Sequence, residues 1–232
     1  MSVEIYDNYI KKLDEIYKYI SDLSMIALNN VDDINKIEGN YFSFNIDDKI
    51  DTTNKYKQAT LYYSSFNAVL NICEIGFNAG FSSLLILLSR KKIKSTNLLI
   101  FDIGTHKYVK PCLEYLRQNF ENEDENIKTT IKYIEGNSII TAPEYINSNP
   151  SLIGTFDLIH VDGGHTYECI INDMKNADIL LKINGIIVID DTNVNYIYET
   201  VNNYILSEKY IEIFILDLSK CISPHRIIKK IK

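Results

Sequence analysis

Five short apolar runs alternate with helical patterns from residue 72 onward, and this alternation constrains the fold more than any other feature. Apolar runs that lie between helices are typical of parallel strands covered on both faces. The chain therefore predicts an α/β fold in which helices cover both faces of a mostly parallel sheet. The expected strands are Ile72–Ile75, Leu98–Phe101, Thr130–Ile134, Asp157–Val161 and Gly185–Ile189, and the expected helices are Phe81–Arg90, Val109–Phe120, Ile139–Asn147, Glu168–Leu181 and Asn195–Leu206.

The alternation changes at both ends of the chain. Apolar side chains recur every three or four positions over residues 1–30, which indicates an amphipathic helix, and residues 53–70 predict another helix leading into the first strand. Residues 31–52 are polar and irregular, so they form either a linker or a flap over the site. The last apolar runs, Tyr210–Leu216 and Ile222–Lys229, are too close for a crossover connection, so we expect an antiparallel hairpin.

Length and composition favour one unit. A chain of 232 residues that is 46% hydrophobic can bury a full core. We expect residues 1–52 to be a helical segment and candidate lid within the same unit as a domain over residues 53–232. The net charge of −7 argues against a nucleic-acid partner, because phosphate binding relies on clustered Lys and Arg. Scattered cysteines, no apolar run of membrane-spanning length and an acidic N-terminus lead us to expect a reduced, cytoplasmic protein without a membrane partner.

One predicted strand stops abruptly at Asp162-Gly163-Gly164-His165, and a helical pattern follows. In an open α/β sheet, ligands bind outside the carboxyl ends of the strands, where such a corner lies. An acid and an imidazole this close can share a proton or a metal ion. This corner is therefore the predicted active site, whereas we expect His160, inside the strand, to be a satisfied core residue.

A second corner follows the first predicted strand. Gly76 and Gly80 have neither the GxGxxG spacing of a dinucleotide site nor the Lys-Ser/Thr pair of a P-loop. The preceding acid, Glu74, would repel a phosphate and would suit a cationic or hydroxyl-bearing ligand. Asp102, at the tip of the second strand, is placed to accept hydrogen bonds from ribose hydroxyls. The patterns also allow a tight turn without a ligand at the glycines, and a helix-capping role for Asp102.

Five motifs occur in order along the middle of the chain: Glu74–Ser82, Phe101–Tyr108, Ile134–Ser138, Phe156–Glu168 and Ile187–Thr192. Together they resemble class I S-adenosylmethionine-dependent methyltransferases, and most closely the branch with a DGGH motif after strand four, which is similar to small-molecule and sugar O-methyltransferases. The resemblance covers roughly residues 70–192. It implies a Rossmann-like, seven-stranded, mostly parallel sheet with an antiparallel last strand and helices on both faces. The N-terminal helices are extra to it.

The resemblance also assigns residues to the cofactor, S-adenosylmethionine. Asp102 would hold the ribose, and Asn137 and Ser138 would flank the adenine. The family often has an acid where Asn137 stands, but an amide oxygen can still accept from the adenine amino group. His106 and Tyr108 are either part of the cofactor rim or an exposed helix start. The residues expected to cradle the methionine part are Glu74, Gly76, Asn78, Gly80 and Ser82.

The remaining acids are candidates for a role in the chemical step. Asp162 ends the fourth strand of the expected sheet, and Asp190 and Asp191 end its neighbour. Three converging carboxylates repel one another unless a cation lies between them, and such oxygen ligands suit Mg²⁺, Mn²⁺ or Ca²⁺. The resemblance to catechol-type and sugar O-methyltransferases implies a metal that binds two vicinal substrate oxygens. Alternatively, Asp162 and Asp191 only cap helices.

His165 is a candidate general base, because its ordinary pKa lies near neutrality; alternatively, it binds the cofactor rim. The expected function is methyl transfer to a hydroxyl of a small molecule, with a sugar or nucleotide-sugar as the first choice. The alternatives are a catalytically silent cofactor-binding partner subunit and a methyltransferase acting on a nucleic acid or protein. The aromatic-rich N-terminal helices would suit packing against a second copy in a homo-oligomer.

Overall fold

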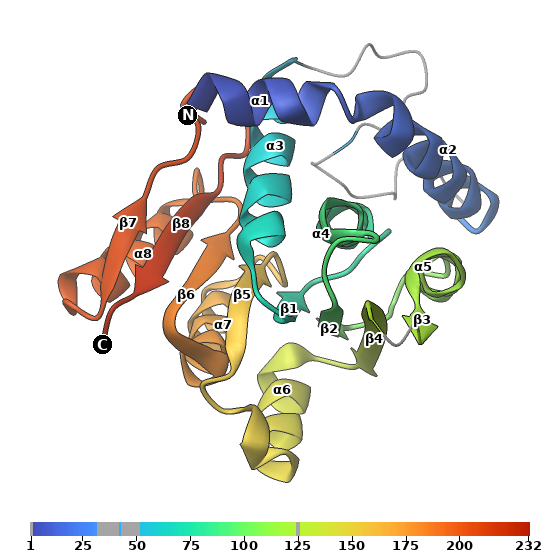
Figure 1. Cartoon of the computed structure of the whole chain (residues 1–232). Helices are drawn as coiled ribbons and strands as arrows, with labels where there is room; N and C mark the ends of the chain where they lie inside the picture. The colour runs from blue at the N-terminus through green and yellow to red at the C-terminus, as the bar shows by residue number, and fades with distance from the viewer. Residues whose placement is uncertain (1, 32–41, 43–51, 124–125) are drawn as a thin grey trace.

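A single mixed sheet runs through the chain, in the strand order β3-β4-β2-β1-β5-β6-β8-β7 (Figure 1). The computed structural model describes residues 2–31, 42, 52–123 and 126–232. The strands are β1 (Asn71–Ile75), β2 (Thr96–Asp102), β3 (Asn122–Glu123), β4 (Lys128–Glu135), β5 (Phe156–Val161), β6 (Leu181–Ile189), β7 (Tyr210–Ile213) and β8 (Arg226–Lys230). The helices are α1 (Ser2–Ile10), α2 (Leu13–Asn29), α3 (Thr52–Asn67), α4 (Phe81–Arg90), α5 (Val109–Phe120), α6 (Ser138–Ser148), α7 (Tyr167–Leu180) and α8 (Asn195–Leu206).

The predicted sheet is confirmed. Strands β4, β2, β1, β5 and β6 pair in parallel, and β8 is antiparallel to both β6 and β7. The two-residue β3 adds a short antiparallel edge beside β4, so the described residues contain one strand more than the seven expected. The hairpin is also confirmed, but its second strand starts at Arg226 rather than Ile222. The preceding segment leaves the sheet because the Pro224 carbonyl accepts bonds from both the amide and the hydroxyl of Thr192.

Alternation along the strands divides the core into two layers. Ile72, Leu158 and Val188 belong to the cluster on the face covered by α1 to α5, whereas Cys73 and Ile159 belong to the cluster under α6, α7 and α8 (Figure 1). Successive side chains of a strand point to opposite faces, so apolar residues at every position fill both layers. The layers hold the carboxyl ends of the parallel strands together at one edge.

The N-terminal helix expected over residues 1–30 is divided into two. The chain turns after α1, where the amide of Lys12 donates to the carbonyl of Tyr9 at 2.9 Å. Helix α1 packs against α3, and α2 packs against α4 and α5. The expected lid lies almost entirely outside the described residues; within it, Phe42 is buried with its ring 5.6 Å from that of Phe81. The division into residues 1–52 and 53–232 stays a prediction.

The four cysteines are not joined in disulfide bonds. Within the part of the chain that the structure describes, no helix has both the length and the apolar character needed to cross a membrane.

Arg90 ties α3 to the sheet. Its side chain is completely buried at the end of α4, and its guanidinium donates to the carbonyls of Ser65, Ala68 and Val69 at the end of α3 at 2.6 to 2.9 Å. It also donates to Ser95 O at 2.6 Å, just before β2. The last carbonyls of a helix have no partner within the helix, so a planar donor with several N–H groups satisfies them at once. Burial lowers the pKa of Arg90 to about 10, which leaves it charged at neutral pH.

We predict that Arg90→Met lowers the free energy of unfolding by roughly 3 kcal/mol or more, because it removes the donor to the buried carbonyls of Ser65 and Ala68 and to the partly buried carbonyls of Val69 and Ser95. Urea unfolding followed by circular dichroism measures this loss. Lys94→Met is the control: Lys94 also donates to the end of α3, at Phe66 O, but from the surface, so its loss should cost within about 0.5 kcal/mol. Equal effects of the two substitutions would contradict this role of Arg90.

Candidate functional site

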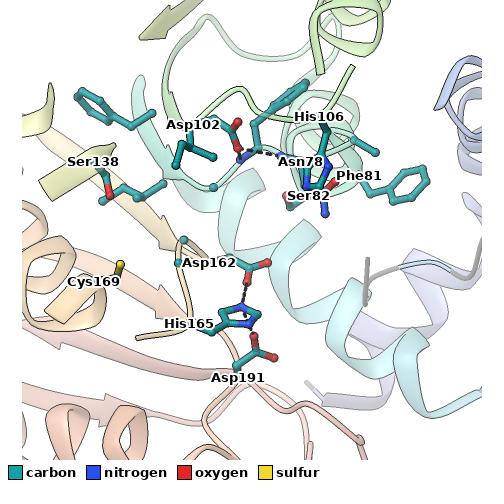
Figure 2. A pocket seen from close by; sticks show the side chains of 18 of the residues that line it. Asn78, Phe81, Ser82, Asp102, His106, Ser138, Asp162, His165, Cys169 and Asp191 are labelled. Atoms are coloured by element: carbon teal, nitrogen blue, oxygen red, sulfur yellow. Dashed lines mark hydrogen bonds and ion pairs between the residues drawn. The ribbon is translucent and has the colours of Figure 1, made fainter. Parts of the chain in front are cut away.

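One pocket of about 880 Å³ opens at the carboxyl ends of the parallel strands (Figure 2). This volume is within the range of small-molecule and cofactor sites. Most of the residues predicted from the sequence line it: Gly76, Asn78, Ser82, Asp102, Asn137, Ser138, Asp162, His165 and Asp191. Glu74, Gly80 and Asp190 do not line it.

The turn after β1 depends on left-handed backbone. Gly76 has φ +94°, and a Cβ there would lie 1.9 Å from the carbonyl oxygen of Asp162. Glycine is therefore required for the turn after β1 to contact the corner after β5. Gly80 precedes α4 with φ +80° and packs against the Phe77 ring, so it shapes the turn without facing the pocket.

Glu74 lies beneath the pocket rather than in it. Its side chain is fully buried, where it accepts a hydrogen bond from the Ser83 hydroxyl and lies 3.2 Å from Nδ1 of His160. The predicted direct contact of Glu74 with the methionine part does not fit this position. The reason is strand alternation, which puts the side chain on the α3 side of β1, in register with His160 of β5. His160 is a satisfied core residue, as expected.

Asp102 organises the loops at the tip of β2. Its carboxylate accepts hydrogen bonds from the amides of Phe77 (2.7 Å), Asn78 (3.1 Å) and Gly104 (2.7 Å). Tyr108 is buried and donates to the Asn78 side chain at 2.6 Å, and the ring of His106 stacks on it. His106 lines the pocket, which fits the rim alternative better than an exposed helix start.

The far wall of the pocket is formed by the start of α6. Asn137 is the N-cap residue of this helix: its side-chain oxygen accepts from the amide of Ile139 at 3.1 Å. Below this wall, Asp173 is buried under Gly163, and burial raises the pKa of Asp173 to about 6 against the effect of a hydrogen bond from Ser138. Asp173 is a buried acid beside the site that the sequence did not single out.

At the opposite end of the pocket, His165 lies between two carboxylates (Figure 2). Its Nε2 is 2.8 Å from Oδ2 of Asp191 and 4.0 Å from Oδ1 of Asp162. The nearby carboxylates of Asp162 and Asp191 raise the pKa of His165 to about 10. Burial on its own would raise the pKa of Asp191, but hydrogen bonds with His165 and Ser223 outweigh burial and lower the pKa to about 2.

This arrangement does not favour the predicted role of His165 as a general base, which stays a prediction. An imidazole with a pKa near 10 is protonated at neutral pH and cannot accept a proton. In this geometry His165 is instead a cation that faces the pocket beside Asp162. The sequence showed that an acid and an imidazole share the corner, but it could not show that a second acid, Asp191, would hold the proton on the ring.

Asp190 lies on the other side of the same turn and is fully buried. Its Oδ1 is 2.6 Å from Nζ of Lys57, which is itself buried on α3, and accepts from the amide of Asp191 at 2.7 Å. Burial and the charge of Asp162 raise the pKa of Asp190, whereas the Lys57 ammonium opposes this shift. Lys57 carried no recognisable signal, because nothing in a polar helical stretch distinguishes a buried lysine from a solvated one.

The three predicted metal ligands therefore do not form one set of free carboxylates. Among the described residues, two groups place donor atoms within 4.8 Å of one another: Asp162 with His160 and Asp190, and Asp162 with His165 and Asp191. In the first group Asp190 is paired with Lys57, and in the second Asp191 is paired with His165. Lys57 thus neutralises one of the three acids expected to hold a divalent ion, and His165 contacts another.

The comparisons with known proteins agree with this geometry. A family model described as a methyltransferase domain matches residues 73–192. Among solved structures, the chain is similar to the SAH-bound methyltransferase PaMTH1 of Podospora anserina, with 14% identity and a TM-score of 0.56 over 92% of this chain and 88% of that chain. It is also similar to a protein from Corynebacterium glutamicum, with 12% identity and a TM-score of 0.54 over 76% and 81% of the two chains. No curated protein matches.

The ion pair at the corner makes a testable prediction. By NMR, His165 should titrate near pH 10, and Asp191→Asn should move its pKa down toward the ordinary value of about 6.5. The stabilisation from His165 is complete below its unfolded pKa and is lost as the pH rises through about 10. That from Asp191 is complete above its unfolded pKa and is lost as the pH falls through about 2. An unchanged His165 pKa in Asp191→Asn would contradict the pairing.

Proposed function

The chain belongs to the family described as a methyltransferase domain and is a class I S-adenosylmethionine-dependent methyltransferase, and we propose that it methylates a hydroxyl oxygen of a small molecule. The observation that carries the proposal is the row of Asp162, His165 and Asp191 at one end of the pocket (Figure 2). A carboxylate and a protonated imidazole side by side can accept the proton of a hydroxyl and stabilise the charge left on its oxygen. A sugar or nucleotide-sugar fits this proposal as a hydroxyl-rich acceptor.

The residues at the other end of the pocket fit S-adenosylmethionine. Gly76 and Asn78 give a turn whose backbone can closely approach the methionine part. Ser82, in the first turn of α4, lies among amides without helical partners, which suit a carboxylate. Asp102 would accept hydrogen bonds from the ribose hydroxyls, and Asn137 would accept one from the adenine amino group. Both residues line the pocket. When bound, the cofactor supplies a methyl group on a positively charged sulfur.

Asp162 and His165 divide the work on the acceptor. Asp162 would accept the hydrogen bond from the acceptor hydroxyl and take its proton when the methyl group is transferred to that oxygen. His165 keeps its proton, because Asp191 holds it, and its charge stabilises the developing negative charge on the oxygen. Asp191 is thus a positioning residue, and Ser223, which donates to it, fixes its other oxygen.

Divalent-metal assistance is the finer prediction that the site fits least well. The expected set needs Asp162, Asp190 and Asp191 as free ligands, and Asp190 is instead a partner of Lys57. We therefore assign no step to a metal ion. An acceptor of low molecular weight remains our proposal, since an acidic chain with a carboxylate-lined pocket end would repel a nucleic-acid backbone.

The cofactor assignment predicts that Asp102→Ala weakens S-adenosylmethionine binding by about 10- to 100-fold. The loss corresponds to hydrogen bonds to one charged group, which are worth about 1.5–3 kcal/mol. Titration calorimetry measures the affinity. Glu144→Ala, an exposed acid on α6, should bind the cofactor as the unchanged protein does. Undiminished affinity in Asp102→Ala would remove the assignment.

The reaction is tested with a panel of sugars, nucleotide-sugars and catechols, by measuring release of S-adenosylhomocysteine and locating the new methyl group by NMR. Asp162→Asn should lower turnover by about 100-fold or more while leaving cofactor affinity within about threefold. His165→Gln should also lower turnover, and His165→Lys, which keeps the positive charge, should retain more activity than His165→Gln. Methyl transfer to nitrogen or sulfur alone would contradict the proposed O-methylation.

A further inference from the structure

Beneath the acceptor end of the pocket lies a layer of buried polar side chains that the proposed reaction does not use. They face α3 from four neighbouring strands or strand ends, because every second position of a strand points to the same face. Each is at most 4% exposed. The layer consists of Glu74 of β1, His160 of β5, Asp190 after β6 and His225 before β8.

Lys57 reaches this layer from α3. Its side chain is completely buried, and its ammonium is 2.6 Å from Oδ1 of Asp190. Burying a charge is costly unless an opposite charge and hydrogen bonds compensate for it, so a fully buried lysine of this kind indicates a specific role. Burial lowers the pKa of the neighbouring His225, and the charge of Lys57 adds to this shift, which favours a neutral imidazole.

The pair connects directly to the acceptor end of the pocket. The same Oδ1 of Asp190 accepts the amide of Asp191, whose φ is +52°, a conformation that non-glycine residues rarely adopt. This bond holds the turn that presents the Asp191 carboxylate to His165. Lys57 therefore acts on the site through Asp190 and Asp191, without lining the pocket itself.

The position of the ammonium is informative. His160, Asp162 and Asp190 each offer a donor atom, all within 4.8 Å of one another, which is a spacing that a metal ion can bridge. Within this group, Asp190 directs its Oδ1 at the Lys57 ammonium. A monovalent ammonium on the chain thus contacts one member, Asp190, of a group of ligands that would suit a divalent ion.

We propose that Lys57 is a built-in replacement for a divalent cation, beside a latent metal site formed by His160, Asp162 and Asp190. Its ammonium neutralises Asp190, holds the Asp190–Asp191 turn and makes the site independent of metal. The effect on catalysis rests on the proposed function, because it acts through the orientation of His165. The latent site does not, because metal binding can be measured without any acceptor.

The test compares Lys57→Ala, which removes the ammonium and opens space, with Lys57→Met, which removes the charge but fills the space. The probe is Mn²⁺ alone, followed by its EPR signal and by the melting temperature of the full chain. The unchanged protein and Lys57→Met should show no saturable Mn²⁺ binding at this site. Lys57→Ala should bind one Mn²⁺ and melt at a higher temperature with it, and Lys57→Ala combined with Asp190→Asn should lose both effects.

Millimolar Mg²⁺ should raise the melting temperature of Lys57→Ala in the same way. Specific Mn²⁺ binding by the unchanged protein that Asp190→Asn abolishes would overturn the proposal, because it would show that Lys57 leaves room for an ion. The absence of binding in a folded Lys57→Ala would also overturn it. If Lys57→Ala is unfolded in EDTA, refolding with Mn²⁺ supports the proposal, and failure to refold counts against it.

Once an acceptor is found, turnover separates a positioning role from a purely structural one. Lys57→Ala in EDTA should lose about 10- to 100-fold in turnover, as is typical when a residue that orients a site is lost, and Mn²⁺ should restore most of it. The unchanged protein should be equally active with and without EDTA. If no acceptor is methylated, the proposed O-methylation fails while the Mn²⁺ measurements still decide the role of Lys57.

Discussion

The contact between the turn after β1 and the corner after β5 is the constraint on which the site depends. Gly76 lies so close to the Asp162 carbonyl that any side chain there would overlap it. This contact fixes the distance between the cofactor end and the acceptor end of one pocket. In-line methyl transfer gains mainly from such positioning, since reacting atoms held at the right distance avoid most of the entropic cost of encounter.

Charge compensation is the second constraint on the site. Asp162, Asp190 and Asp191 converge because β5 and β6 are parallel neighbours, and like charges at this distance destabilise one another. His165 compensates for this negative charge from the pocket side of the turn, and Lys57 compensates for it from the core side. The acids therefore differ in their contacts: Asp162 lines the pocket, Asp191 is paired with His165, and Asp190 is paired with Lys57.

The sequence predicted the sheet and most of the pocket because both follow from local patterns. Alternating apolar runs define β1, β2, β4, β5 and β6, and residues directly after parallel strands must gather at one edge. The partners of individual side chains do not follow from local patterns. The partner of Glu74 is His160 and that of His165 is Asp191, and both partners are distant in sequence. Lys57 could not be predicted, since only tertiary packing distinguishes it from an exposed lysine.

The proposed use of the Lys57 ammonium in place of a metal ion has a consequence for recognition of the acceptor. A divalent ion in the pocket could bind two vicinal oxygens of an acceptor at once, whereas the Lys57 ammonium is buried and directed at Asp190. Recognition of the acceptor then depends on side chains that face the pocket, such as Asn193 and His165. Each of these can hydrogen-bond to a single oxygen, so a strict requirement for a vicinal diol does not follow from this site. Selection among hydroxyls would come from the shape of the pocket and from which oxygen reaches Asp162.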